Sequence, residues 1–230
     1  MLEGLNKEQL EAVKQTEGPL LVLAGAGSGK TKVLTTRIAY LIKEKNISPY
    51  NILAITFTNK AANEMKERIY KMLGNINGMQ ISTFHSFGLR IIKENYETLG
   101  YKSNFTIIDS DDSLTIIKKI MKDLNIDPKV FNPKAIKNSI SGAKNELVSS
   151  ADYSRYAASE FEQKVEQVYK NYEAKLITNN SLDFDDLLIL PIKLFKENPK
   201  ILEKYQELFK YILIDEYQDT NKAQSILVIM

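Results

Sequence analysis

A glycine-rich octapeptide between an apolar run and a helical pattern constrains this chain more than any other feature. The octapeptide covers residues 24–31 and the apolar run covers residues 20–23. Glycine lets the backbone turn tightly and bring successive N–H groups onto anion oxygens, while the following helix directs its positive end at the same anion. This order of strand, loop and helix predicts a nucleotide-phosphate loop. The alternative is a glycine-rich turn without a ligand.

The end of this loop carries the residue types that handle a triphosphate and its metal. We expect Lys30 to reach the β and γ phosphates and Thr31 to offer a hydroxyl to Mg²⁺. The usual pattern begins with glycine, and Ala24 stands in that position. The residues expected to contact nucleotide here are Ala24, Gly25, Ala26, Gly27, Ser28, Gly29, Lys30 and Thr31.

Two adjacent carboxylates follow a later apolar run at residues 211–214. The carboxyl end of a strand beside a phosphate loop would let Asp215 hold the hydration shell of Mg²⁺ and let Glu216 orient and deprotonate the attacking water. Taken alone, this pair is often a strand end that meets solvent. Together with the phosphate loop, it favours a hydrolytic motor over a phosphotransferase, because a phosphotransferase has less need of a water-activating glutamate.

Composition restricts the protein class less sharply. The chain of 230 residues is 43% hydrophobic, enough for a real core, and its 31 Lys and Arg nearly balance 29 Asp and Glu. Whole-chain charge therefore neither requires nor excludes a polyanionic partner. There is no cysteine, which excludes disulfides and Cys-based zinc sites. Because no signal-peptide pattern or membrane-length apolar run is present, we expect a cytoplasmic protein with no membrane partner.

The order of apolar runs predicts an α/β fold with a parallel sheet. Expected strands cover residues 20–23, 52–57, 80–83, 105–108 and 211–214, and helical patterns separate three of them. The clearest helix has apolar residues at helical spacing between residues 61 and 73, with Thr58 or Asn59 as its cap and Gly74 as its end.

Between residues 109 and 181 the strand runs stop, and helical patterns predict an all-helical insertion. Its first half, residues 115–144, holds seven Lys and two Asp, and we interpret such a lysine-rich face as solvated surface in the first instance. Two apolar faces are expected to form its core: Ile116, Ile117, Ile120, Met121 and Leu124, and Phe161, Val165, Val168, Tyr169, Tyr172 and Leu176.

A series of motifs resembles, in the same order, those of superfamily 1 DNA helicases of the UvrD/Rep/PcrA type. Residues 5–13 resemble the Q motif, residues 24–31 motif I in its common Ala-initial form, and residues 55–65 motif Ia. Residues 82–86 resemble the Thr-Phe-His segment, residues 182–188 a further family motif, and residues 214–221 motif II. The resemblance covers nearly the whole chain.

This resemblance implies a RecA-like motor domain 1A, formed by residues 1–108 and 182–230 and interrupted by a helical domain 1B at residues 109–181. It assigns adenine recognition to Gln9 and coupling of nucleotide state to motion to Gln218. It also assigns contacts with single-stranded DNA to Phe57, Asn59, Lys60, Thr83, Phe84 and His85. For Phe57 and Phe84 the alternative is core packing, and for His85 it is a structural hydrogen bond.

The implied function is the ATP-binding and DNA-contacting N-terminal half of an ATP-dependent 3′-to-5′ DNA helicase. Its cofactors would be ATP and Mg²⁺, and its partners single-stranded and duplex DNA and a C-terminal motor half. We expect this chain to end before motif III and the second motor domain and therefore not to unwind DNA by itself. The alternatives are a stand-alone ATP- or DNA-binding module and part of a recombination helicase-nuclease subunit.

Overall fold

The computed structural model describes residues 1–25 and 27–230, so the predicted role of Ala26 lies outside the described residues. Residue contacts divide the chain into two compact units. The first unit comprises Met1–Phe84 and Lys200–Asp219, and the second comprises His85–Pro199 and Thr220–Met230. The division into domains 1A and 1B stays a prediction, because these contact units group different residues.

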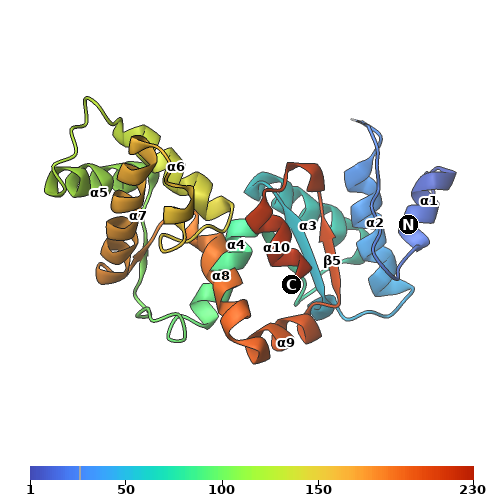
Figure 1. Cartoon of the computed structure of the whole chain (residues 1–230). Helices are drawn as coiled ribbons and strands as arrows, with labels where there is room; N and C mark the ends of the chain where they lie inside the picture. Colours follow the sequence, from blue (N-terminus) through green and yellow to red (C-terminus); the bar gives the residue numbers. More distant parts are fainter. Residues whose placement is uncertain (26) are drawn as a thin grey trace. The chain divides into compact units, whose positions relative to one another are not determined.

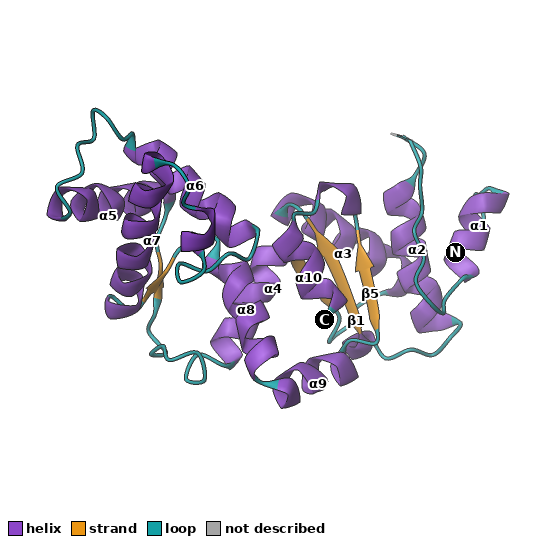
Figure 2. Cartoon of the chain, viewed as in Figure 1, coloured by secondary structure: helices purple, strands orange, loops and turns teal. Residues whose placement is uncertain are grey.

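The first unit is built on a parallel three-stranded sheet of β1 (Ile52–Thr56), β2 (Gln80–Thr83) and β5 (Tyr211–Ile214), in the order β2-β1-β5 (Figure 2). Leu53 lies in register with Gln80 on one side and Ile212 on the other. All five residues of β1 are buried, as expected for a central parallel strand that is covered on both faces. The predicted parallel α/β architecture is confirmed.

Three helices of this unit pack on one another in order (Figure 1): α1 (Lys7–Lys14) packs on α2 (Lys30–Lys43), α2 packs on α3 (Asn59–Leu73), and α3 packs on β1 and β2. The predicted helix after the second apolar run is confirmed, since the Thr58 side chain caps α3 and Gly74 ends it with a positive φ of 78°. A further helix, α9 (Pro199–Leu208), precedes β5. The core of the unit includes Ile38, Leu41, Ile52, Ala54, Met65, Ile69, Ile81 and Leu213.

Residues 20–23 do not form the strand that their composition predicts. They are irregular and their apolar side chains are exposed, Leu21 by 66% and Leu23 by 86%. β5 pairs with β1 at one edge, and a cavity of about 740 Å³ is lined by both residues 20–23 and β5. A strand needs a partner at hydrogen-bonding distance, and no strand among the described residues pairs with this segment. Apolar composition alone could not supply that partner.

The second unit is mainly helical, with α4 (Phe84–Glu94), α5 (Ser110–Asp123), α6 (Pro133–Asn145), α7 (Glu160–Thr178), α8 (Asp186–Glu197) and α10 (Lys222–Ile229). The two predicted apolar faces meet in one core, in which α5, α6 and α7 pack on one another. Among the described residues of the chain, no helix is long and apolar enough to cross a membrane.

The two strands of a small parallel sheet precede and follow these three helices in sequence. β3 (Thr106–Ile107) pairs with β4 (Ser181–Leu182), which joins the start and the end of the predicted insertion. The expected strand at residues 105–108 is therefore shorter than predicted and lies outside the main sheet. β4 was not predicted from the sequence, because two residues are too few to show an alternating pattern.

The lysine-rich segment is only partly solvated. Of its seven lysines, Lys118, Lys119, Lys122, Lys129 and Lys134 are exposed. Lys144 is buried, with 2% of its surface exposed, so the solvated interpretation is wrong for this residue. The reason is a pair of carboxylates far away in sequence: Lys144 Nζ lies 2.7 Å from Asp183 Oδ2 and 2.7 Å from Asp186 Oδ1.

Candidate functional site

The candidate nucleotide site lies in the first unit and begins with the glycine-rich loop. Ser28 turns back onto Gly25, whose carbonyl oxygen accepts from the Ser28 backbone N–H at 3.3 Å and from its hydroxyl at 2.7 Å. Gly27 and Gly29 have φ values of 74° and 87°, in the left-handed region that favours glycine. Glycine is therefore required here by backbone conformation, as the motif predicts.

The N-terminus of α2 is open to an anion. Its N-cap is Gly29, which has no side chain to cap the helix, and its first turn contains no acidic residue. The first N–H groups of a helix have no partner within the helix, and the helix dipole adds positive potential there. Lys30 and Thr31 are the first two residues of α2. These features fit a phosphate group.

The acidic pair lies beside the end of the glycine-rich loop. The Asp215 backbone N–H donates to the Ile55 carbonyl at 3.0 Å, which extends the β1–β5 pairing, and Thr31 Oγ1 donates to Asp215 Oδ2 at 3.3 Å. Mg²⁺ is commonly held by one or two protein oxygens together with phosphate oxygens and water, so this hydroxyl and carboxylate fit it. Burial, and secondarily the charge of Glu216, raise the pKa of Asp215. A cation would relieve both effects.

Glu216 joins two other predicted catalytic residues. Its carboxylate lies 3.6 Å from Lys30 Nζ, and Gln218 Nε2 donates to Glu216 Oε2 at 2.6 Å. Lys30 Nζ also donates to the Ala24 carbonyl at 3.3 Å. Glu216 has a φ of 52°, and such a conformation costs a residue other than glycine about 1–3 kcal/mol. Strained residues of this kind cluster at functional sites.

Gln9, the predicted adenine reader, lies beside the phosphate loop. Its Nε2 donates to the Ser28 carbonyl at 2.8 Å, and its Oε1 accepts from the Asn6 backbone N–H at 3.0 Å as part of the capping box of α1. Both ends of the amide therefore have partners within the protein. A contact with adenine would exchange one of them, and this role stays a prediction.

Arg37 is a residue of this site that the sequence analysis did not find. Its guanidinium donates to the carbonyls of Ala12 at 2.7 Å, of Thr16 at 3.4 Å, and of Gln15, so it ties α2 to the end of α1. Burial lowers its pKa, an effect that Glu17 opposes. The bonded carbonyls lie 21–25 residues away in sequence, and no local pattern could reveal such a contact.

The predicted DNA-contacting residues of the first unit divide into exposed and buried groups. Asn59 and Lys60 are exposed at the start of α3, and Phe57 is half-buried. Thr83 and Phe84 are buried, with 8% and 1% of their surfaces exposed. The Phe84 ring packs edge to face against Phe57, with centroids 5.6 Å apart. A base cannot reach either face of Phe84, which supports the core-packing alternative for this residue.

The remaining predicted DNA-contacting residue, His85, lies in the second unit and stacks on Phe184, with ring centroids 4.1 Å apart and an interplanar angle of 23°. The Phe184 side chain is 58% exposed. Burial lowers the pKa of His85, and the charge of Asp185 acts in the opposite direction. The motif at residues 182–188 did not by itself assign a role to Phe184, although an aromatic residue between acids is a visible signal.

Comparison with known proteins identifies the family of this chain. The profile of the UvrD/REP helicase N-terminal domain matches residues 5–230. The chain belongs to this family.

Curated relatives agree along nearly the whole chain. The ATP-dependent DNA helicase PcrA of Bacillus subtilis (strain 168) is 55% identical over 229 residues. The protein of the same name from Staphylococcus aureus (strain Mu50) is 53% identical, and that from Staphylococcus epidermidis is 52% identical. Each match covers 99% of this chain and 31% of the relative. The chain therefore spans about a third of the length of these relatives.

Proposed function

We propose that this chain is the ATP-binding, single-stranded-DNA-contacting N-terminal part of an ATP-dependent 3′-to-5′ DNA helicase. The observation that carries this proposal is the convergence of two segments 184 residues apart: Thr31 at the open N-terminus of α2 donates to Asp215 at the carboxyl end of β5. A hydroxyl, a carboxylate and an uncapped helix end at one place suit a nucleotide triphosphate with Mg²⁺. The helicase names of the relatives support the reaction.

Each residue of the site has a defined role in this proposal. Lys30 and the first N–H groups of α2 would bind the phosphates, and Thr31 and Asp215 would hold Mg²⁺, which would supply positive charge against that of the triphosphate. Glu216 accepts a proton from the attacking water. In the structure, Glu216 is paired with Lys30. Phosphates that draw Lys30 away would release the Glu216 carboxylate, so that Glu216 becomes free to act as the general base only when nucleotide is bound.

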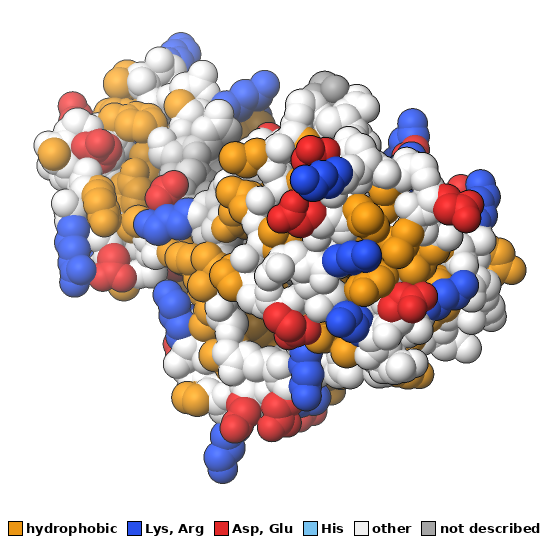
Figure 3. Space-filling view, turned by 90° about the vertical axis from the view of Figure 1, so that its right-hand side faces the viewer, with side chains coloured by type: hydrophobic (Ala, Val, Ile, Leu, Met, Phe, Trp, Pro, Cys, Tyr) orange, Lys and Arg blue, Asp and Glu red, His pale blue; other side chains and the backbone are white. Residues whose placement is uncertain are grey.

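Single-stranded DNA is the second proposed ligand. Lys60 and Asn59 are exposed and suit phosphate contacts, while the exposed face of Phe184 offers a stacking surface for a base. Basic and acidic side chains are interspersed on the face seen in Figure 3. Because the proposed contacts include one cation, Lys60, the affinity for DNA should fall only gently with salt.

The isolated chain is proposed to be a binding module without motor activity. An arginine from a facing domain typically stabilises the transition state of phosphoryl transfer. Within the described residues, Arg37 is committed to backbone carbonyls and Arg90 pairs with Glu94. We therefore expect no sustained strand separation and little DNA-stimulated ATP hydrolysis from the purified chain. A purified chain that unwinds duplex DNA, with full-length helicase excluded by mass spectrometry, would contradict this expectation.

Nucleotide binding is tested by calorimetry with Mg²⁺ and a non-hydrolysable ATP analogue. Lys30→Ala should weaken binding about 10- to 100-fold, because a hydrogen bond to a charged group contributes about 1.5–3 kcal/mol. Lys32→Ala is the matched control, since this exposed lysine of the same helix donates to the Gly4 carbonyl. Equal affinities for wild type and Lys30→Ala would refute the assignment.

DNA binding is tested with a fluorescent oligothymidine. Lys60→Gln and Phe184→Ala should each weaken binding. Lys60→Gln should leave thermal stability unchanged, because that side chain is exposed, and Phe184→Ala should lower it only by the lost stacking on His85. Phe84→Ala should instead lower stability, because that ring is buried. Affinities that do not change in Lys60→Gln and Phe184→Ala would show that DNA binds elsewhere.

A further inference from the structure

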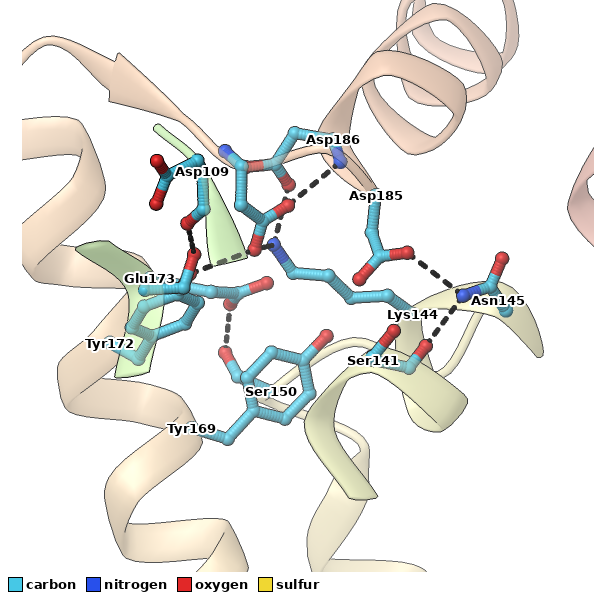
Figure 4. A network of polar contacts seen from close by, with 12 residues as sticks. Asp109, Ser141, Lys144, Asn145, Ser150, Tyr169, Tyr172, Glu173, Asp185 and Asp186 are labelled. Carbon is cyan, nitrogen blue, oxygen red and sulfur yellow. Dashed lines mark hydrogen bonds and ion pairs between the residues drawn. The ribbon is translucent and has the colours of Figure 1, made fainter. Parts of the chain in front are cut away.

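The side-chain amides of Asn145 and Asn221 join three distant segments of the second unit. Asn221 Nδ2 donates to Asn145 Oδ1 at 2.6 Å, and Asn145 Nδ2 donates to Asp185 Oδ1 at 3.0 Å. Asn145 Nδ2 also donates to the Ser141 carbonyl at 2.8 Å. Figure 4 shows Asn145 at the end of α6, between Ser141 and Asp185. We call Asn221, Asn145 and Asp185 the amide chain.

The donors and acceptors of the amide chain can be arranged in only one way, because the partners of each amide fix its orientation. A carboxylate and a carbonyl oxygen only accept hydrogen bonds, so Asn145 must turn its NH₂ group toward Asp185 and Ser141. Its oxygen is then left for Asn221. The Asn221 oxygen in turn accepts from the Gln224 backbone N–H at 2.8 Å and caps α10, so its NH₂ group points to Asn145. Reversing either amide would set acceptors against acceptors.

One end of the amide chain lies next to the proposed DNA surface. Asp185 follows Phe184, whose ring stacks on His85. The Asp185 carboxylate makes no capping hydrogen bond to its own helix, α8, and instead accepts a hydrogen bond from Asn145.

Both sides of this short loop are held firmly. Asp183 and Asp186 exchange backbone-to-carboxylate bonds of 3.0 Å, and the buried Lys144 binds both carboxylates. Phe184 and Asp185 are the two residues between these fixed points, so a displacement of Phe184 by a stacked base would act directly on Asp185.

The other end of the amide chain lies next to the acidic pair in sequence. Asn221 is six residues after Asp215 and follows the 3₁₀ turn Tyr217–Asp219, which contains Gln218. Because Asn221 both caps α10 and bonds to Asn145, its position sets where the segment after the acidic pair begins its helix.

We propose that Asn145 is a positioning residue that couples DNA occupancy at Phe184 and His85 to ATP turnover at Asp215 and Glu216. The inference rests on the proposed function and adds to it a specific relay, Asp185 to Asn145 to Asn221. A base on Phe184 shifts Asp185, the directed bonds move Asn221, and the segment that carries the acidic pair responds. Such a coupling is reciprocal in binding: nucleotide also changes the affinity for DNA.

Near-isosteric substitutions break the relay at chosen bonds. Asn145→Asp keeps the acceptor for Asn221 but places a carboxylate against that of Asp185. Asn221→Asp keeps a good N-cap for α10 but removes the donor to Asn145. The double variant Asn145→Asp/Asp185→Asn restores a donor and an acceptor with the polarity reversed, because the new amide at position 185 can donate to the new carboxylate at position 145.

The matched control breaks the neighbouring exposed ion pair. Lys222 Nζ and Glu146 Oε2 lie 3.4 Å apart, with side chains 52% and 63% exposed. They bridge the same two segments, one residue further along, but such exposed pairs contribute little. Glu146→Gln should therefore behave as wild type.

The measurement is ATP hydrolysis by a full-length helicase that carries this segment, with and without oligothymidine. Asn145→Asp and Asn221→Asp should each lower DNA-stimulated kcat about tenfold, an ordinary size for coupling between sites, and leave the DNA-independent rate unchanged. The double variant should recover most of the stimulation. Thermal unfolding should show all variants folded at the assay temperature.

Several results would overturn the relay. Equal losses of the basal and the stimulated rate would indicate a merely structural role for Asn145, as would loss of stability without loss of stimulation. Stimulation that stays at the wild-type level in both single variants, or a double variant no better than Asn145→Asp, would also refute it. If wild type itself binds DNA but is not stimulated, or binds no DNA, the proposed function fails rather than the relay alone.

Discussion

Replacing Lys144 by methionine should destabilise the second unit strongly. Methionine keeps most of the aliphatic stem but removes the cation, and leaves the buried carboxylates of Asp183 and Asp186 without the charge that both of them bind. The Lys144 side chain is 1% exposed, and those of the two aspartates are 9% and 11% exposed. Water can therefore do little to replace the lost charge.

The expected loss is about 3–5 kcal/mol in the free energy of unfolding, the usual cost of breaking a buried ion pair from one side. Two charge-assisted hydrogen bonds of 2.7 Å are lost, and at about 1.5–3 kcal/mol each they give the same magnitude. Lys170→Met is the control, because the exposed pair of Lys170 with Glu166 should contribute no more than about 0.5 kcal/mol.

The loss should also depend on pH. Burial disfavours the charged form of Lys144, but Asp186 and Asp183 more than offset this, so the pKa of Lys144 is raised. Its contribution to stability is therefore complete below the ordinary lysine pKa and is lost only in strong alkali.

Burial raises the pKa of Asp186 to about 6, an effect that Lys144 opposes. A raised carboxyl pKa means that the folded state binds the proton more tightly, so stability falls as pH rises through this range. Removing Lys144 enlarges this effect. The destabilisation in Lys144→Met should therefore be smaller at pH 5 than at pH 8.

Urea denaturation followed by circular dichroism at both pH values measures these quantities, since urea does not screen charge. The triple variant Lys144→Met/Asp183→Asn/Asp186→Asn should recover much of the loss, because neutral groups replace the stranded charges. A midpoint for Lys144→Met within error of wild type would refute the reasoning. So would a loss of the same size at pH 5 and pH 8.

Three further outcomes follow from single positions. Gly88→Ala should destabilise the protein by more than about 2 kcal/mol, because an added Cβ would lie 1.8 Å from the Leu187 carbonyl oxygen. Gly142→Ala in α6, where an added Cβ meets no atom within 4 Å, should stabilise the protein by about 0.5–1 kcal/mol. Thermal unfolding of the two variants measures both effects. Asp215→Asn should reduce the dependence of nucleotide binding on Mg²⁺, and calorimetry at several Mg²⁺ concentrations with an unchanged dependence would contradict the assigned metal role. In a full-length helicase, Glu216→Gln should keep ATP binding but lose most turnover, and a steady-state rate equal to wild type would exclude Glu216 as the base.

Local patterns predicted the parts of the protein that depend on neighbouring residues. The glycines at positions 27 and 29 predict a left-handed backbone conformation, and Thr58 and Gly74 predict the start and end of α3. The phosphate loop and the acidic pair were each visible because their chemistry needs fixed residue types at short spacing.

Long-range partners were not visible in the same way. Residues 20–23 have the composition of a strand, yet no strand lies beside them, because pairing depends on what occupies the neighbouring position in space. Lys144 belongs to a basic segment that the sequence analysis assigned to solvent, and two carboxylates about forty residues later bury it. Phe84 and Phe184 are both aromatic residues in family motifs, and only burial tells them apart.

The sequence by itself therefore determined which chemical groups this protein carries: a glycine-rich loop that ends in Lys30 and Thr31, and an acidic pair at Asp215 and Glu216. Tertiary structure alone decided which of these groups meet and which are covered. It placed Thr31 beside Asp215 and made Asn145 the junction between Asp185 and Asn221. The physical reason is that dihedral preferences and helical spacing act over a few residues, whereas burial and hydrogen-bond partners depend on segments brought together by the whole fold.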